Sequence, residues 1–180
     1  MPTLHTPRLA LHPLVDEDLD WLAALRGDAE VMRYIGIAGP MTFDASRERL
    51  ERYVRCWEEH ELGMFSVRLG DEATPIGWAG LQPLEESGEI EVGYAIGKRA
   101  WGRGIATEAA RAVVRWGFEA RGLDRIVAIA YEENEGSRRV MDKLGMRYEG
   151  MRLVHGTESV YYSLTPQAFA RAASPRSPAT

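Results

Sequence analysis

The hydrophobic period changes within one stretch of the chain, Glu89-Ile90-Glu91-Val92-Gly93-Tyr94-Ala95-Ile96-Gly97-Lys98-Arg99-Ala100-Trp101-Gly102-Arg103-Gly104-Ile105-Ala106-Thr107-Glu108. Up to Ile96, apolar residues alternate with polar or small ones, which is typical of a strand with one buried face. From Ile105 onward the apolar residues recur at helical spacing. The glycines between the two patterns therefore predict a tight turn from a strand into a helix.

This turn has the features of an anion-binding site. Gly102 and Gly104 have no Cβ, so the backbone can adopt positive φ and come close to a ligand. The first N–H groups of the following helix have no intrahelical acceptor and lie at the positive end of its dipole, which favours a phosphate or pyrophosphate. Arg99 and Arg103 add positive charge. A short Gly-x-Gly motif alone is also compatible with a tight connection that binds nothing.

The composition is that of one ordinary soluble domain, with 45% hydrophobic and 27% charged residues in a chain of 180. We expect a single domain over residues 1–170 and a disordered tail over residues 171–180, which are small, polar and proline-containing. The net charge of -5 gives no general attraction to nucleic acid. Cys56 is the only cysteine in the sequence, which excludes an intramolecular disulfide. With no signal peptide or membrane span in the sequence, we expect a cytoplasmic protein without nucleic-acid or membrane partners.

The fold class predicted from the elements is α+β, a mixed and mostly antiparallel twisted sheet flanked by helices. The elements expected before the opening stretch are a strand over residues 7–14, a helix from residues 16–18 to Arg26, a connector over residues 31–40, a helix from an N-cap at Thr42 to His60, and a hairpin of strands over residues 64–69 and 75–84. Those expected after it are the helix ending at Gly122, a strand over residues 125–131, a helix opening at Asn134, and a closing hairpin over residues 146–153 and 159–164. Because a strand, a helix and a strand in this order make a right-handed crossover, one strand pair should be parallel.

The order and spacing of these motifs resemble the GNAT acyltransferases, most closely the branch of ribosomal-protein N-terminal acetyltransferases. The resemblance covers nearly the whole chain, through the segments Thr6-Pro7-Arg8-Leu9-Ala10-Leu11, Glu91-Val92-Gly93-Tyr94, Arg99-Ala100-Trp101-Gly102-Arg103-Gly104-Ile105-Ala106-Thr107-Glu108-Ala109, Asn134-Glu135-Gly136-Ser137, Leu144-Gly145-Met146-Arg147-Tyr148-Glu149-Gly150 and Val160-Tyr161-Tyr162-Ser163-Leu164. The resemblance implies the GNAT fold, in which the parallel strand pair splays apart. It also implies acetyl-CoA as co-substrate.

The resemblance assigns contacts with coenzyme A to the turn, the strand before it and a later helix. Pyrophosphate contacts are implied for Arg99, Ala100, Trp101, Gly102, Arg103, Gly104, Ile105, Ala106 and Thr107. The pantetheine arm lies between the splayed strands, where the backbone of Tyr94, Ala95 and Ile96 would bond it. Asn134 would also bond the arm, and Ser137 would lie near the sulfur.

The implied reaction is direct attack on the thioester by a primary amine of a protein N-terminus or a small molecule, within a ternary complex. A protonated amine is no nucleophile, so a base must take its proton, and N–H donors must stabilise the oxyanion that develops. Glu91 is the leading candidate base, directly or through water, and Glu89 is the second. A backbone N–H near Tyr94 is the candidate oxyanion donor. A solvated position on the polar side of the strand is the alternative for Glu91.

The departing thiolate needs an acid. Many GNAT enzymes place a tyrosine later in the second helix of the site, but the matching residue here is Met141. In the branch that this chain most resembles, a serine at the position of Ser137 is the usual candidate, and we assign the role to Ser137. The alternative is a hydroxyl that satisfies backbone groups at the helix N-terminus. Met141 also leaves open a non-catalytic acyl-CoA-binding or sensor module. A nucleotide-binding Rossmann domain is disfavoured, because the turn follows antiparallel strands.

The sequence does not identify the acceptor amine. The connector over residues 31–40, the second helix and the closing hairpin should shape the acceptor site, and acidic character there would favour a cationic amine. Four arginines of the second helix alternate with acids and are most simply a solvated face; they are Arg47, Arg49, Arg52 and Arg55. The histidines lack metal-ligand spacing, so no metal site is expected. A monomer and a homodimer are both compatible with the sequence.

Overall fold

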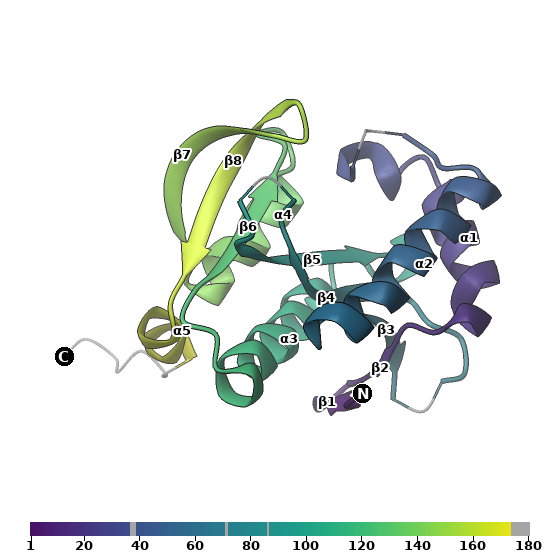
Figure 1. Cartoon of the computed structure of the whole chain (residues 1–180), viewed down its shortest axis with the longest axis horizontal. Helices are drawn as coiled ribbons and strands as arrows, with labels where there is room; N and C mark the ends of the chain where they lie inside the picture. Colours follow the sequence, from purple (N-terminus) through teal and green to yellow (C-terminus); the bar gives the residue numbers. More distant parts are fainter. Residues whose placement is uncertain (37–38, 71, 86, 174–180) are drawn as a thin grey trace.

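A computed structural model describes residues 1–36, 39–70, 72–85 and 87–173 and contains an eight-stranded sheet in the order β1-β2-β3-β4-β5-β6-β8-β7 (Figure 1). The strands are β1 (Leu4–His5), β2 (Leu9–Pro13), β3 (Met64–Leu69), β4 (Gly77–Pro83), β5 (Ile90–Ile96), β6 (Ile126–Ala130), β7 (Arg147–Val154) and β8 (Thr157–Leu164). Only β5 and β6 are parallel among these neighbours; the other pairs are antiparallel. The predicted mixed, mostly antiparallel sheet is confirmed.

The helices begin and end where the local sequence favours it. They are α1 (Leu19–Gly27), α2 (Phe43–His60), α3 (Ile105–Arg121), α4 (Glu135–Leu144) and α5 (Pro166–Ala173), with the short 3₁₀ turns η1 (Asp16–Asp18), η2 (Met32–Tyr34) and η3 (Lys98–Ala100). Thr42 Oγ1 accepts from the Ala45 N–H at 3.1 Å and caps α2. Gly122, at a φ of 65°, ends α3. None of the helices in the described ranges is long and apolar enough to cross a membrane.

Three details differ from the sequence prediction. The strand β1 and the helix α5 were not predicted, because β1 has only 2 residues and α5 is rich in small residues. The helix α5 continues to Ala173, so the first residues of the predicted tail are helical, while residues 174–180 lie outside the described residues. The turn of the closing hairpin is shorter than predicted, with His155 and Gly156 between the strands at φ values of 51° and 73°.

Helices cover both faces of the sheet (Figure 1). On one face, α3 and α4 pack on the central strands in a cluster that includes Val92 and Ile96 of β5. On the other face, residues of α1 and α2 pack against Met64, Trp78 and Ala95. Ala95 is therefore only 5% exposed and Glu91 only 8% exposed. The prediction that β5 has one buried face was wrong, because α1 and α2 cover the side that its polar residues suggested was solvated.

The parallel strands β5 and β6 are joined at their beginnings and then separate. In the described residues, their register contains the pair Glu91 and Val127. Just before the strands, Glu89 Oε1 and Arg125 Nε form an ion pair at 3.0 Å. Beyond these contacts the two strands run in different directions (Figure 1). The splayed pair implied by the family resemblance is thus present, and it opens toward the carboxyl ends of both strands.

Gly80 of β4 is a test of this packing, because a Cβ there would lie 2.3 Å from the Gly63 carbonyl oxygen and 2.5 Å from the Met64 Cα. Both are backbone atoms that cannot turn aside, so we expect Gly80→Ala to lower the free energy of unfolding by about 1–3 kcal/mol. Urea unfolding followed by circular dichroism measures this. The control is Gly136→Ala on α4, whose nearest neighbouring atom is at 3.5 Å and which should be neutral or slightly stabilising. A Gly80→Ala protein as stable as the wild type would contradict the packing.

Candidate active site

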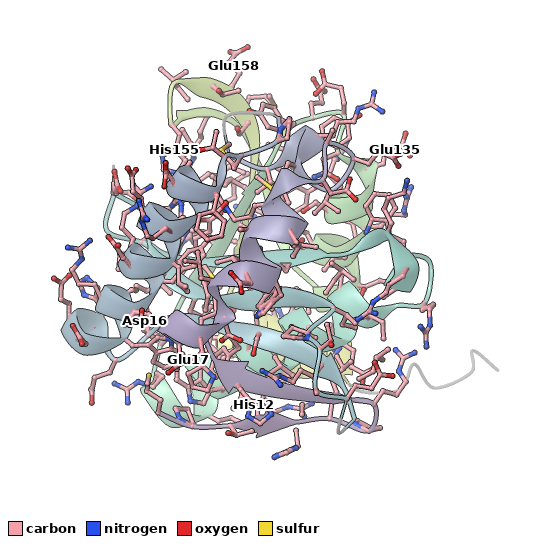
Figure 2. The ribbon with its side chains drawn as sticks, turned by 90° about the vertical axis from the view of Figure 1, so that its right-hand side faces the viewer. His12, Asp16, Glu17, Glu135, His155 and Glu158 are labelled. Carbon is pink, nitrogen blue, oxygen red and sulfur yellow. The ribbon has the colours of Figure 1, made fainter. Side chains whose placement is uncertain are left out.

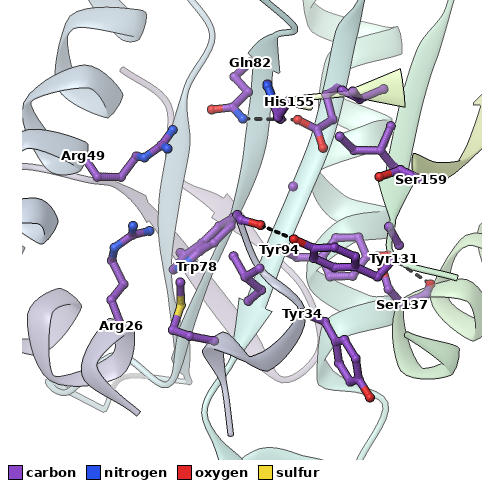
Figure 3. Close-up of a pocket in the computed structure, with 18 of the residues that line it drawn as sticks. Arg26, Tyr34, Arg49, Trp78, Gln82, Tyr94, Tyr131, Ser137, His155 and Ser159 are labelled. Atoms are coloured by element: carbon purple, nitrogen blue, oxygen red, sulfur yellow. Dashed lines mark hydrogen bonds between the residues drawn. The ribbon is translucent and has the colours of Figure 1, made fainter. Parts of the chain in front are cut away.

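A cavity of about 330 Å³ lies where β5 and β6 separate (Figure 3). Its wall contains Glu91 and Tyr94 from β5 and Asn134 and Ser137 from the start of α4. The structure thus brings residues of β5 together with residues of α4 that lie 40 or more positions later in the chain and that the sequence analysis had assigned to the same site. Because Glu91 and Tyr94 point to opposite faces of the sheet, a single cavity can reach both only through the gap beside β5.

The outer walls of the cavity come from the segments predicted to shape the acceptor site. The connector after α1, the helix α2 and the β7–β8 hairpin all contribute lining residues. Figure 2 shows His155 and Glu158 at the tip of that hairpin, and His155 also lines the cavity. The Tyr131 hydroxyl donates to the Gly36 carbonyl at 2.7 Å, which ties the end of β6 to the connector.

The Tyr94 hydroxyl and the Ser137 hydroxyl form a direct hydrogen bond across the sheet–helix boundary. The two oxygens are 2.9 Å apart, and the Tyr94 hydroxyl is also 3.2 Å from the Ser137 carbonyl oxygen, to which it can donate. Burial raises the pKa of Tyr94, although its bond to Ser137 acts in the opposite direction. Tyr94 therefore keeps its proton at neutral pH. Since either hydroxyl can donate to the other, the pair can pass a proton. The sequence analysis gave Tyr94 only a backbone role and missed its side chain.

Asn134 provides the cap of α4. Its Oδ1 accepts from the Ser137 backbone N–H at 3.0 Å. The alternative in which the Ser137 hydroxyl satisfies the helix N-terminus is wrong, because Asn134 performs that function and the Ser137 hydroxyl contacts Tyr94 instead. Met141, one turn further, is 1% exposed and packs in the core. The hydroxyl that lies beside Ser137 comes instead from Tyr94 of β5.

Glu91 is held inside the cavity wall. The Gln82 side-chain N–H donates to Glu91 Oε2 at 3.2 Å, across the β4–β5 pair. The alternative of a solvated Glu91 is wrong, because its side chain is buried. Glu89 does not line the cavity: it accepts from Tyr161 and pairs with Arg125. The Tyr161 hydrogen bond is the main cause that lowers the pKa of Glu89, which makes Glu89 part of a structural ion-pair group rather than a second base.

The glycine-rich turn has the geometry that the sequence predicted. Gly102 and Gly104 have φ values of 72° and 74°, and a Cβ on Gly102 would meet no atom within 4 Å, so the turn borders open space. The first helical hydrogen bond of α3 runs from the Glu108 N–H to the Gly104 carbonyl at 3.0 Å. The N–H groups of residues 105–107 thus have no intrahelical acceptor. These features suit a bound anion.

The side chains around the turn differ in what they can contribute. Ala100 and Ile105 are each 1% exposed in the core, so only their backbone can face a ligand. Trp101 is 48% exposed, and its indole N–H donates to the Ile96 carbonyl, which is therefore already engaged. Tyr94, Ala95, Ile96 and the residues of the turn stay predicted coenzyme A contacts.

The turn is attached to the N-terminal strand through Glu108. Its Oε1 accepts from the Thr6 hydroxyl at 2.6 Å and its Oε2 accepts from Arg8 Nε at 2.7 Å. Arg8 Nη1 also donates to the Arg103 carbonyl at 2.9 Å. Burial opposes ionisation of Glu108, but the hydrogen bonds from Thr6 and Arg8 outweigh it and hold its pKa below the ordinary value. The Thr6–Arg8–Glu108 clamp, as we call these three residues, fixes the position of the turn.

Comparison with known protein families identifies the family to which this chain belongs. A model described as an acetyltransferase (GNAT) domain matches residues 8–147. The chain belongs to the GNAT acetyltransferase family.

Known GNAT proteins resemble this acetyltransferase in sequence and in structure. It is 30% identical over 151 residues to the uncharacterized N-acetyltransferase YoaA of Bacillus subtilis, over 83% of this chain and 85% of that protein. It is 31% identical over 159 residues to the spermidine N(1)-acetyltransferase of Escherichia coli, over 86% and 80% of the two chains. The structure of RimL, a ribosomal L7/L12 alpha-N-protein acetyltransferase in complex with coenzyme A, superimposes with a TM-score of 0.77 at 14% identity, over 93% of this chain and 99% of that one, which shows a common fold. The predicted GNAT enzyme is confirmed, whereas the ribosomal-protein branch stays a prediction.

This acetyltransferase has a group of arginines in the cavity wall that the sequence analysis missed. They are Arg26 of α1 and Arg49 and Arg52 of α2. The prediction that the α2 arginines form a solvated face was wrong for Arg49, which is half-buried, and incomplete for Arg52, which is exposed at the cavity rim. Their spacing beside the buried Tyr53 was the available signal, because residues next to the apolar stripe of a helix lie at the edge of the surface on which that stripe packs.

Among the described residues, no group of His, Cys, Asp and Glu could hold a metal ion.

The Thr6–Arg8–Glu108 clamp predicts a pH-dependent stability. Glu108→Gln should lower the free energy of unfolding at pH 7 by about 1–3 kcal/mol, because charge-assisted hydrogen bonds are lost. Since the folded-state pKa of Glu108 lies below its unfolded value, this contribution is present above about pH 5 and lost as pH falls through the folded pKa. The difference between wild type and variant should thus shrink between about pH 5 and pH 3, measured by urea unfolding. Glu119→Gln, exposed on the same helix, is the control; a pH-independent difference for Glu108→Gln would contradict the clamp.

Proposed function

We propose that the chain transfers the acetyl group of acetyl-CoA to a primary amine by direct attack within a ternary complex. The observation that supports this most is the convergence of Glu91, Tyr94 and Ser137 on one cavity at the gap between β5 and β6. One group can accept a proton, the other two can donate one, and the gap lies between them. Transfer from a thioester to an amine needs this combination.

The residues of the turn fit the pyrophosphate of coenzyme A. The open space beside Gly102 and the N–H groups of residues 105–107 would receive it, with Arg99 and Arg103 adding positive charge. The backbone of Tyr94 and Ala95 would hold the pantetheine arm in the gap. When bound, acetyl-CoA supplies an acetyl group activated as a thioester.

The proton steps follow from the positions of the side chains. Glu91 takes the proton of the amine, directly or through water, so that the nitrogen lone pair is free to form the new C–N bond. The Tyr94–Ser137 hydroxyl pair donates a proton as the C–S bond breaks, so the sulfur leaves as a thiol. A backbone N–H near Tyr94 stabilises the negative charge that develops on the carbonyl oxygen. The ammonium group loses two protons, one to free the lone pair and one after the C–N bond has formed; one proton reaches the sulfur and the other is released to water, so the reaction is balanced.

The relatives do not indicate one class of acceptor, because their names refer to different amines. One relative is named for spermidine and one structural neighbour for a ribosomal protein N-terminus.

The non-catalytic alternative loses its main support, since Met141 is a core residue and Tyr94 brings a hydroxyl to Ser137. The cytoplasmic location and the choice between monomer and homodimer stay predictions.

Glu91→Gln tests the base. We expect kcat to fall by about 10²–10⁴-fold, because the amide cannot take the amine proton, while the Kd for acetyl-CoA from calorimetry stays unchanged. Thiol release with a panel of amines and peptide N-termini measures the rate. Glu158→Gln, exposed on the hairpin outside the cavity, is the control. A protein that does not bind acetyl-CoA at millimolar concentrations would refute this function, and a Glu91→Gln variant at full rate would refute Glu91 as the base.

The hydroxyl pair is tested by a double-mutant cycle. Tyr94→Phe and Ser137→Ala should each lower kcat by about 10–100-fold, and the double variant should be hardly slower than the slower single variant, because the two hydroxyls act as one proton donor. Thiol release at saturating acetyl-CoA measures the cycle, and thermal unfolding checks the fold. Fully additive losses would show that the hydroxyls act independently.

A further inference from the structure

The wall of the cavity formed by α1 and α2 carries an excess of positive charge. Arg26, Arg49 and Arg52 all line it. In the described part of the chain, none of the three forms an ion pair with a carboxylate, although nine other basic residues do. The three arginines outnumber the two carboxylates that also line the cavity, those of Glu48 and Glu91, so the positive charges favour an anion that joins them.

Three buried N–H donors on this wall have no acceptor among the described residues. Arg26 and Trp78 are each 5% exposed, and the Arg26 Nε and the Trp78 Nε1 have no hydrogen-bond partner; the buried Nε of the half-buried Arg49 has none either. All three residues line the cavity, and Figure 3 shows the guanidinium groups of Arg26 and Arg49 approaching one another beside Trp78. Buried donors are normally paired, so these three suit an acceptor that a ligand supplies.

The electrostatics agree with this geometry. Burial is the main cause that lowers the pKa of Arg26, and the charges of Arg49 and Arg52 lower it further. A guanidinium nevertheless keeps its proton in proteins. Arg49 also lies 5.8 Å above the Tyr53 ring, whose own ring packs 5.9 Å from Trp78. These contacts hold the donors in place on one side of the cavity.

We infer that the acceptor is an amine that also bears a carboxylate, which Arg26, Arg49 and Trp78 bind while its nitrogen faces Glu91. The planar fork of a guanidinium matches a carboxylate with two parallel hydrogen bonds. Glu91, on the same face of the sheet, would repel the carboxylate and attract the ammonium group, so the two ends of the acceptor are oriented. For a polycationic amine the same wall offers one carboxylate, that of Glu48, beside three arginines. This inference rests on the proposed function, because it names the acceptor of that reaction.

The first test compares acceptors. Thiol release from acetyl-CoA is measured with free amino acids, the matching amino acid amides, peptides that begin with Asp or Glu, and spermidine. We expect the best acceptor to bear a carboxylate and its amide to have a kcat/KM at least about tenfold lower. Free amino acids and acidic peptide N-termini are the two sources of the carboxylate, and the panel distinguishes them. A best acceptor without a carboxylate, or an equal rate for acid and amide, would overturn the inference.

The second test removes the charge. Arg49→Gln should raise KM for the carboxylate-bearing acceptor about tenfold or more, with little change in kcat, and should abolish the preference for acid over amide. Arg55→Gln, exposed on the same helix and outside the cavity, is the control that should keep both values. Arg26→Gln should have the same effect where thermal unfolding shows that it folds. An Arg49→Gln variant that keeps the acid-to-amide ratio would overturn the inference.

Calorimetry with acetyl-CoA distinguishes a failure of the proposed acetyltransferase function from a failure of the proposed carboxylate site. If acetyl-CoA binds and amides or spermidine are acetylated as well as the acids, the acetyltransferase function stands and the carboxylate site is wrong. If acetyl-CoA does not bind, the proposed function is wrong and the acceptor class is wrong with it.

Discussion

The separation of β5 from β6 is the constraint on which the rest of the site depends. A continuous sheet would keep Tyr94 and Ser137 on one face and Glu91 on the other, with no route between them. The ion pair of Glu89 with Arg125 and the pairing of Glu91 with Val127 hold the strands at their beginnings, and the strands then run apart. The lost backbone hydrogen bonds are unfavourable for the fold, but they create donors and acceptors that a ligand in the gap can use.

Two features keep this opening in a defined shape. On the cofactor side, the Thr6–Arg8–Glu108 clamp joins the turn to the N-terminal strand, so that the start of α3 has a fixed direction. On the acceptor side, the Tyr131 hydroxyl ties β6 to the connector at Gly36. Each of these contacts joins segments far apart in the sequence, and neither contributes directly to the proposed chemistry. Their role is to position the groups that do.

Some residues of the cavity wall lower the stability of the protein when no ligand is bound. The arginines on α1 and α2 and the unpaired buried donors of Arg26, Arg49 and Trp78 are unfavourable in the protein alone. Local violations of this kind are expected at binding sites, where a ligand supplies the missing partner. Glu91 is likewise a buried carboxylate in the cavity wall, and the Gln82 side-chain N–H donates to it.

The sequence by itself determined the elements and most of their bounds. Thr42, Gly122 and the glycines of the turn determine the backbone conformation of their sequence neighbours. Their effects can therefore be predicted without knowledge of the fold. It also named Glu91, Tyr94, Asn134 and Ser137, through the family resemblance, although it left their roles and the acceptor open. Only the tertiary structure decided that both faces of β5 are buried, that the Tyr94 and Ser137 hydroxyls meet, and that Arg26 and Arg49 lie in one wall. The physical reason is that burial and pairing depend on which elements stack together, and hydrophobic periodicity fixes the face of each element but not its partner.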